Sequence, residues 1–156
     1  MKNLKEHIVE GLKIGAKTKV NTKPEHNYHP KSFKELHTLI AQLIKERGKE
    51  ADLNDIDTSK ITDMAYMFYD SDFNGDISNW DVSNVTSMYD MFLDSKFNGD
   101  ISKWDVSNVV DMGHMFYGSK FNGDISKWDV NNVKYMSGIF YDSPLQNNPP
   151  KWYKKK

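Results

Sequence analysis

The hydrophobic and polar positions repeat every 24 residues through the central part of the chain. Three copies begin at Asp57, Asp81 and Asp105 and end on a tryptophan, and a fourth begins at Asp129 and departs from the pattern at Pro144. A unit of this size cannot bury a hydrophobic core alone, whereas stacked units share one continuous core. The repeat therefore predicts a solenoid.

The apolar residues inside each copy have a regular spacing. The leucine-rich-repeat spacing L-x-x-L-x-L-x-x is matched by Ile101, Trp104, Val106 and Val109. It predicts a strand over residues 103–107, with Trp104 and Val106 facing inward. A short helical turn should follow, with an inner side made of Met112, Met115 and Phe116.

The segments that flank the repeats have other patterns. Ser32 and Glu35 form a capping box before an apolar stripe that stops at Gly48, which predicts a helix over residues 32–47. We divide the chain into an amphipathic helix or leader (1–15), a basic linker (16–31), an N-terminal helical cap (32–50), the solenoid (51–143), and a C-terminal cap with a basic tail (144–156).

The repeated phrase W-D-V-S-N-V-x-x-M-x-x-M-F-x-x-S-x-F-N-x-D-I-S resembles the BspA-type leucine-rich repeat of bacterial surface proteins and phage-encoded proteins. The resemblance covers roughly residues 50–145. It implies an α/β fold, a short leucine-rich-repeat-like solenoid used for binding, and it brings no catalytic residues with it.

The formal net charge of −1 combines three unlike segments. Residues 1–50 carry +5, residues 51–143 carry −10 and residues 144–156 carry +4, and all sixteen acids of the middle segment are Asp. Four of them occupy equivalent positions, at Asp57, Asp81, Asp105 and Asp129. Two interpretations are open: the carboxylates accept hydrogen bonds in Asx turns, or they form an acidic strip that attracts a basic protein surface.

Specificity for a partner should reside at outward positions that differ between copies. One such position holds Asn79, Lys103 and Lys127, and a second holds Ala65, Tyr89, Gly113 and Ser137. Two more hold Tyr66, Asp90, His114 and Gly138, and Tyr69, Leu93, Tyr117 and Tyr141. The predicted partner-binding residues are Asp57, Asp81, Tyr89, Asp90, Lys103, Asp105, His114, Tyr117, Lys127 and Asp129.

One segment matches a calcium-binding loop. Residues 70–77 satisfy D-x-D-x-N-G-x-I, with Asp81 at the twelfth position. The next copies replace the first and third positions by Asp94 and Lys96, and then by Gly118 and Lys120, while F-N-G-D-I-S persists. The persistent part is better explained as turn and core, so no metal is predicted.

The remaining chemistry-bearing residues fit a core better than a site. The M-x-x-M pairs suit packing better than copper binding, because Ile139 replaces one partner, and the repeated tryptophans suit a buried stack better than a sugar-binding face. His114 varies between copies, and the chain has no Cys and no phosphate loop or nucleophile elbow. We therefore predict no enzyme and no cofactor.

The sequence thus favours a non-enzymatic, monomeric protein-binding module. A bacterial or phage-encoded effector that regulates or inhibits another protein is the first hypothesis, and a nucleic-acid-handling protein is one class of partner. Direct binding of nucleic acid is disfavoured because the array would repel phosphate. The first residues lack the apolar core of a secretory signal, which favours the cytoplasm, and no apolar run in the sequence approaches the length of a membrane span. The alternative is a surface or virion adhesin of BspA type that binds host protein or glycan.

Overall fold

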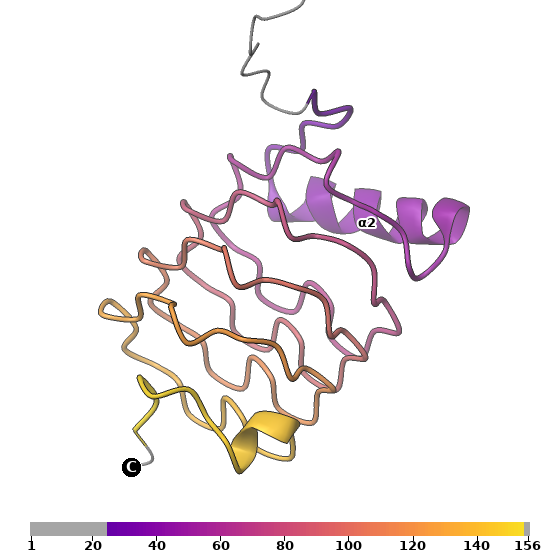
Figure 1. Cartoon of the computed structure of the whole chain (residues 1–156). Coiled ribbons are helices and arrows are strands. Elements are labelled where there is room, and N and C mark those ends of the chain that lie inside the picture. Colours follow the sequence, from indigo (N-terminus) through magenta and orange to yellow (C-terminus); the bar gives the residue numbers. More distant parts are fainter. Residues whose placement is uncertain (1–24, 155–156) are drawn as a thin grey trace, which may run out of the picture.

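The computed structural model describes residues 25–154. They contain one α-helix, α2 (Phe33–Arg47), and one short 3-10 helix, η1 (Pro144–Gln146). The rest of the described residues wind through successive layers that lie beside one another, with α2 at one end and η1 at the other (Figure 1). Residues 57–80, 81–104, 105–128 and 129–152 are called layers 1 to 4 below.

The predicted α/β leucine-rich-repeat-like solenoid is wrong, because residues 25–154 contain no sheet. Isolated parallel bridges join neighbouring layers, such as those of Ser87 with Asp63 and with Asp111. The strand expected over 103–107 does not form, because its N–H groups bond within the layer. Trp104 N donates to Ile101 O (3.2 Å) and Ser107 N donates to the Asp105 carboxylate (3.1 Å), so this segment folds into consecutive reverse turns.

The predicted helical turn is also absent. At the equivalent place in layer 2, alternate backbone N–H groups donate to layer 3 at 2.8–3.0 Å: Met88 to Asp111, Asp90 to Gly113, Phe92 to Met115, and Asp94 to Tyr117. The backbone is left-handed at Asp90 and Asp94 (φ 54° at both). A helix would bond these donors within its own turns, so hydrogen bonding between layers excludes it.

The prediction of which residues face inward is confirmed. Trp104 is 4% exposed and Val106 is 1% exposed. Phe68, Phe92, Phe116 and Phe140 stack through four layers with ring centroids 5.5–6.0 Å apart. The interpretation of the methionines as core is confirmed by the burial of Met64, Met67, Met88, Met91, Met112 and Met115. Each large apolar side chain buried in this way contributes about 1.5–3 kcal/mol.

Helix α2 forms where the capping box predicted it. The Ser32 hydroxyl accepts a hydrogen bond from Glu35 N (3.2 Å), and the Glu35 carboxylate accepts one from Lys31 N (2.8 Å). Gly48 ends the helix with φ 93°. The helix buries Leu36, Ile40 and Leu43 in the same apolar cluster that fills the layers.

A ladder of tryptophans sets the register between layers. Each indole Nε1 donates at 2.8–3.1 Å to a carbonyl 27 residues earlier, in the pairs Trp80 to Leu53, Trp104 to Ile77, Trp128 to Ile101, and Trp152 to Ile125. The pair of Trp152 shows that the 24-residue register continues past Pro144, where the sequence departs from the repeat. Leu145 is buried at the position equivalent to Phe121.

Replacing Trp104 by Phe should lower the free energy of unfolding by about 2–3 kcal/mol, because it leaves a cavity and removes the donor to the buried Ile77 carbonyl. The same change at the half-buried Trp152 should cost less. Urea unfolding followed by circular dichroism measures both. Equal losses at the two positions would contradict the expectation that burial of the indole sets the size of its contribution.

Candidate functional site

The first group of predicted site residues forms the Asp57 ladder, defined as Asp57, Asp81, Asp105 and Asp129. In each, Oδ1 accepts a hydrogen bond from the backbone N–H two residues later, at 3.0–3.1 Å. The Asx-turn interpretation is therefore confirmed. Because a Glu side chain is one methylene too long for this turn, the turns also explain why these acids are Asp.

Hydrogen bonding in the turns lowers the pKa of two of these carboxylates, those of Asp57 and Asp105. Hydrogen bonding by Ser59 lowers the pKa of Asp57 to about 2, and His29 Nδ1 lies 3.3 Å from its second oxygen. Hydrogen bonding by Ser107 likewise lowers the pKa of Asp105. A structural role in the turn and an electrostatic role at the surface are thus compatible.

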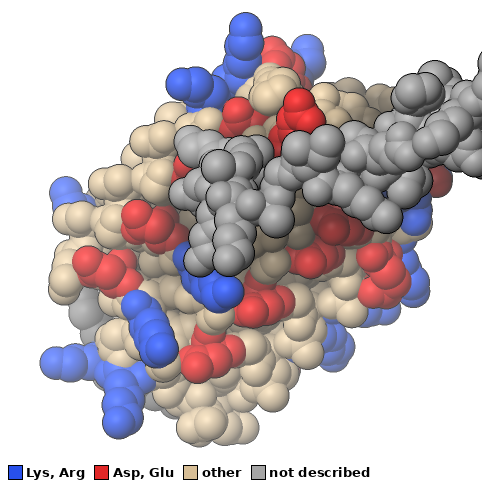
Figure 2. Space-filling view, turned by 45° about the horizontal axis from the view of Figure 1, so that its top comes forward, with Lys and Arg blue, Asp and Glu red and all other residues tan. Residues whose placement is uncertain are grey.

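A second ladder of acids accompanies the first. Its members, Asp52, Asp76, Asp100 and Asp124, make the same turn with hydrogen bonds of 2.8–2.9 Å. The predicted site residues Lys103 and Lys127 belong to this region, where their charges help to lower the pKa values of Asp100 and Asp124, after the larger effect of the serine hydrogen bonds. Figure 2 shows acidic and basic side chains mixed on one face of the molecule.

Three of the other predicted site residues, Tyr89, His114 and Tyr117, belong to an aromatic strip. The strip is defined as Tyr69, Tyr66, Tyr89, His114, Tyr117 and Tyr141. Consecutive rings in this order have centroids 6.2, 5.5, 5.7, 5.9 and 5.0 Å apart. The strip therefore crosses all four layers. Tyr66, Tyr69 and Tyr141 are 49%, 52% and 57% exposed, so much of the ring surface is open to a partner.

Left-handed backbone holds part of the strip. Tyr66 has φ 63°, and the equivalent Asp90, His114 and Gly138 have φ 54°, 50° and 63°. Gly, Asp and His tolerate this conformation better than a large ring does. The variability of this position in the sequence thus follows a backbone requirement, and Tyr66 keeps its ring there under conformational strain.

Glycines of one layer make room for side chains of the layer before it. A Cβ added at Gly113 would lie 3.0 Å from the Tyr89 ring, and one at Gly138 would lie 2.6 Å from the His114 ring. Tyr89 and His114 therefore lie directly over these glycines. The close packing fixes the two rings in place.

Asp90 lies among the rings of the strip and is only 7% exposed. His114 Nδ1 is 3.3 Å from Asp90 Oδ1, but this oxygen accepts no well-directed hydrogen bond from the residues described. Burial raises the pKa of Asp90, and the nearby His114 opposes that rise. The pKa of the Tyr66 hydroxyl is also raised. Burial is the larger cause of this rise, and the negative charge of Asp90 is the second.

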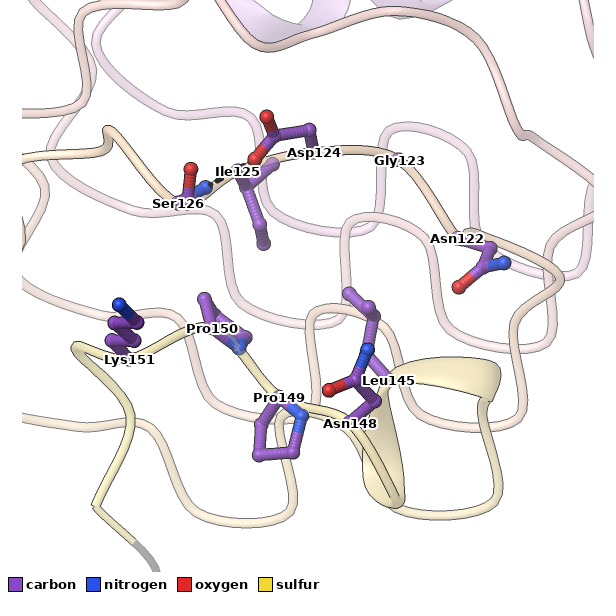
Figure 3. Close-up of a pocket in the computed structure, with 10 residues that line it drawn as sticks. All are labelled: Asn122, Gly123, Asp124, Ile125, Ser126, Leu145, Asn148, Pro149, Pro150 and Lys151. Atoms are coloured by element: carbon purple, nitrogen blue, oxygen red, sulfur yellow. Dashed lines mark hydrogen bonds between the residues drawn. The ribbon is translucent and has the colours of Figure 1, made fainter.

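Two cavities lie at the ends of the stack. The larger, of about 700 Å³, separates the turn at residues 122–126 from the segment 148–151 (Figure 3). Asp124 and Lys151 are the charged residues of its lining, and Asp124 Oδ1 is already bonded to Ser126 N. The smaller, of about 340 Å³, lies between α2 and residues 66–72, so it borders the aromatic strip.

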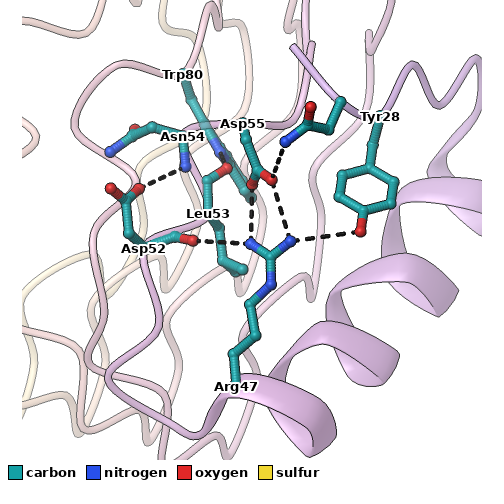
Figure 4. A network of polar contacts seen from close by, with 8 residues as sticks. Tyr28, Arg47, Asp52, Leu53, Asn54, Asp55 and Trp80 are labelled. Atoms are coloured by element: carbon teal, nitrogen blue, oxygen red, sulfur yellow. Dashed lines mark hydrogen bonds and ion pairs between the residues drawn. The ribbon is translucent and has the colours of Figure 1, made fainter. Parts of the chain in front are cut away.

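Arg47 makes the most extensive ion-pair network among the described residues (Figure 4). Its guanidinium binds both carboxylate oxygens of Asp55 at 3.1 Å, the Asp52 carbonyl at 3.2 Å and the Tyr28 hydroxyl at 3.4 Å. This hydrogen bonding lowers the pKa of Asp55. The network joins the end of α2 to the start of the stack, which is a structural role.

Two other features, a metal-binding cluster and a membrane-spanning helix, are absent from residues 25–154. No group of three or more acidic, histidine or cysteine side chains in this range could hold a metal ion. None of the helices described is long and apolar enough to cross a bilayer.

A family model described as "Mycoplasma protein of unknown function, DUF285" matches residues 35–152. The chain belongs to this family. No curated protein and no solved structure matches it significantly. The family match spans α2 and all four layers of this DUF285 protein, so the Asp ladders and the aromatic strip both lie within the family region.

The predicted site residues of the DUF285 chain divide into two groups. Tyr89, Asp90, His114 and Tyr117 come together in the strip. The Asp57 ladder, with Lys103 and Lys127, lies elsewhere in the layers, and no ring contact or ion pair within residues 25–154 joins the two groups. Tyr66, Tyr69 and Tyr141 were not among the predicted site residues, although their variability between copies singled them out.

Replacing Asp105 by Ala should lower the free energy of unfolding by about 0.5–1.5 kcal/mol, because the Ser107 N–H loses its acceptor. Replacing it by Asn should cost less, because Asn also accepts in this turn. Chemical denaturation of the two variants measures the difference. If Asn costs as much as Ala, the charge of Asp105 matters more to stability than the turn.

Acid should destabilise the protein through Asp57. Its pKa is about 2 in the folded chain against an ordinary value of 3.8, so its stabilising effect is complete above about pH 4 and is lost as the pH falls through 2. The loss should be about 1–2 kcal/mol. Carbon-detected NMR titration gives the pKa, and urea unfolding at pH 5 and pH 2 gives the stability. The Asp57→Asn variant should lose less between these pH values than the wild type does.

Proposed function

We propose that this DUF285 protein is a non-enzymatic protein-binding module that contacts its partner through the aromatic strip. The observation that carries the proposal is the unbroken series of rings across four layers, with three tyrosines about half exposed. Tyrosine combines a large apolar surface with a polar hydroxyl, and it is enriched at protein interfaces.

The backbone beneath the strip favours binding. Asp90 N and His114 N donate to the next layer at 3.0 and 2.9 Å, so the segments that carry the rings are fixed before a partner arrives. A preorganised surface loses less conformational entropy on binding than a flexible loop does. The fixed strip thus supports a stable complex.

The Asp ladders support the choice of a basic partner. Residues 51–143 carry a net charge of −10, and the lowered pKa values of Asp57 and Asp105 keep those acids ionised near neutral pH. Such a field speeds the approach of a positively charged protein surface. A nucleic-acid-handling protein with a basic groove is one such partner, and its regulation or inhibition by a bacterial or phage-encoded effector is the outcome we propose.

The proposal is tested by removing the strip without disturbing the core. Tagged wild-type protein and the variant Tyr66→Asn, Tyr69→Ser, Tyr141→Ser are purified from the cell that encodes the chain, and co-purifying proteins are quantified by mass spectrometry. The partner should be reduced at least about tenfold in the variant, because a few central aromatic residues dominate most interfaces.

The matched control is Asp81→Asn with Asp105→Asn, which removes two charges and keeps both turns. This control should retain most of the partner. Retention by the strip variant together with loss from the control would assign binding to the Asp57 ladder instead. Near-ultraviolet circular dichroism checks that both variants are folded.

A further inference from the structure

The carboxylate of Asp90 is an unusual group to find within an aromatic surface. Its side chain is 10% exposed, and Oδ1 accepts no well-directed hydrogen bond among the described residues even though His114 Nδ1 is 3.3 Å away. A buried carboxylate that lacks part of its hydrogen bonding is costly to the fold. Oδ1 itself is closed off from solvent, so a donor from a partner would reach the carboxylate through its exposed part and would offset some of that cost.

The exposed acids beside the strip favour a positively charged donor. Asp70 and Asp142 directly follow Tyr69 and Tyr141 of the strip, and Asp94 has the equivalent position in layer 2. All three are exposed and have left-handed backbone. Within residues 25–154 none of the three takes part in an ion pair. A cation that approaches the rings would therefore meet the negative charge of these acids as well as that of Asp90.

The flat surface of the rings favours arginine over lysine. A guanidinium is planar and weakly hydrated, so it stacks on aromatic faces while its N–H groups donate to a carboxylate. A lysine ammonium keeps a tight hydration shell that a nearly closed site would strip away. The exposed Tyr66 ring packs against the ring of Tyr89, the residue before Asp90, with centroids 5.5 Å apart, and Tyr66 N donates to Tyr89 O at 2.9 Å, so one guanidinium could contact both Tyr66 and Asp90.

We propose that the partner inserts an arginine side chain into the aromatic strip, stacked on Tyr66 and paired with Asp90. This inference rests on the proposed protein-binding function and names the chemistry of the partner at one position. A glycan would use the same rings without needing the carboxylate, so it is treated as an outcome of the test.

The test uses the full chain labelled with nitrogen-15 and the probe acetyl-Gly-Arg-Gly-Arg-Gly-amide. Titration should shift the amide signals of residues 65–69, 89–93 and 113–117. The same peptide with lysine should bind at least about fivefold more weakly, and the peptide with the neutral isostere citrulline should not bind measurably. Asp90→Asn should weaken binding of the arginine peptide about tenfold.

The matched control is Asp124→Asn, which removes the same charge on the second Asp ladder and keeps its turn acceptor; it should change the affinity less than about twofold. A second variant, Tyr66→Leu, removes the ring face and should also weaken binding. Equal affinities of Asp90→Asn and Asp124→Asn, or equal binding of the lysine peptide, would overturn the inference. So would shifts of the strip signals with cellopentaose and none with the peptide.

Failure of this inference can be separated from failure of the proposed function. If Asp90→Asn retains the native partner while the triple tyrosine variant loses it, the arginine assignment is wrong and protein binding through the strip stands. If both variants retain the partner, the strip is not the binding surface. The amide spectrum of each variant shows directly whether the layers are intact.

Discussion

Every contact between the layers depends on equivalent residues being 24 positions apart. Three kinds of hydrogen bond use this register at different parts of the coil: the indole of Trp104 to Ile77 O, the side-chain amide of Asn108 to Ser83 O, and the backbone N–H of Met88 to Asp111 O. Inserting one residue in a layer would shift all three together. The stack therefore tolerates substitution at the surface far better than a change of length.

The inward residues could be predicted from sequence, because burial repeats with the period of the layers whatever the backbone does between them. The path of the backbone between those residues could not be predicted in this way. The spacing of Ile101, Trp104 and Val106 fits a strand and a series of turns equally well, and the deciding signal lies in Asp100 and Asp105, each two residues before a serine. In those pairs the Asp carboxylate accepts a hydrogen bond from a backbone N–H group that a sheet would need.

The two ends of the stack also show that local signals are easier to predict from sequence than contacts between layers. Ser32, Glu35 and Gly48 predict α2 because capping is local. Trp152 continues the tryptophan ladder although Pro149 and Pro150 replace the Ile and Ser that stand at these positions in the other three layers. A contact made across 27 residues can persist where the local pattern has disappeared.

The candidate site was partly visible in the sequence. Tyr89, Asp90, His114 and Tyr117 were selected because outward positions vary between copies, and the structure brings them into one strip. The exposure of Tyr66 and the burial of Asp90 depend on how side chains of one layer cover the next, so no single copy of the repeat reveals them. The presence of Asp, His and Gly at one position was the available sign of left-handed backbone.

The glycines beneath Tyr89 and His114 also constrain how such a surface can change over generations. At these two places the ring of one layer lies against a residue without Cβ in the next layer, Gly113 or Gly138. Mutations that exchange a ring and a glycine at such places should therefore arise as pairs of positions 24 apart, one gaining bulk as the other loses it. New specificities can then be acquired by exchanging such pairs, while the Phe and Trp columns inside remain as they are.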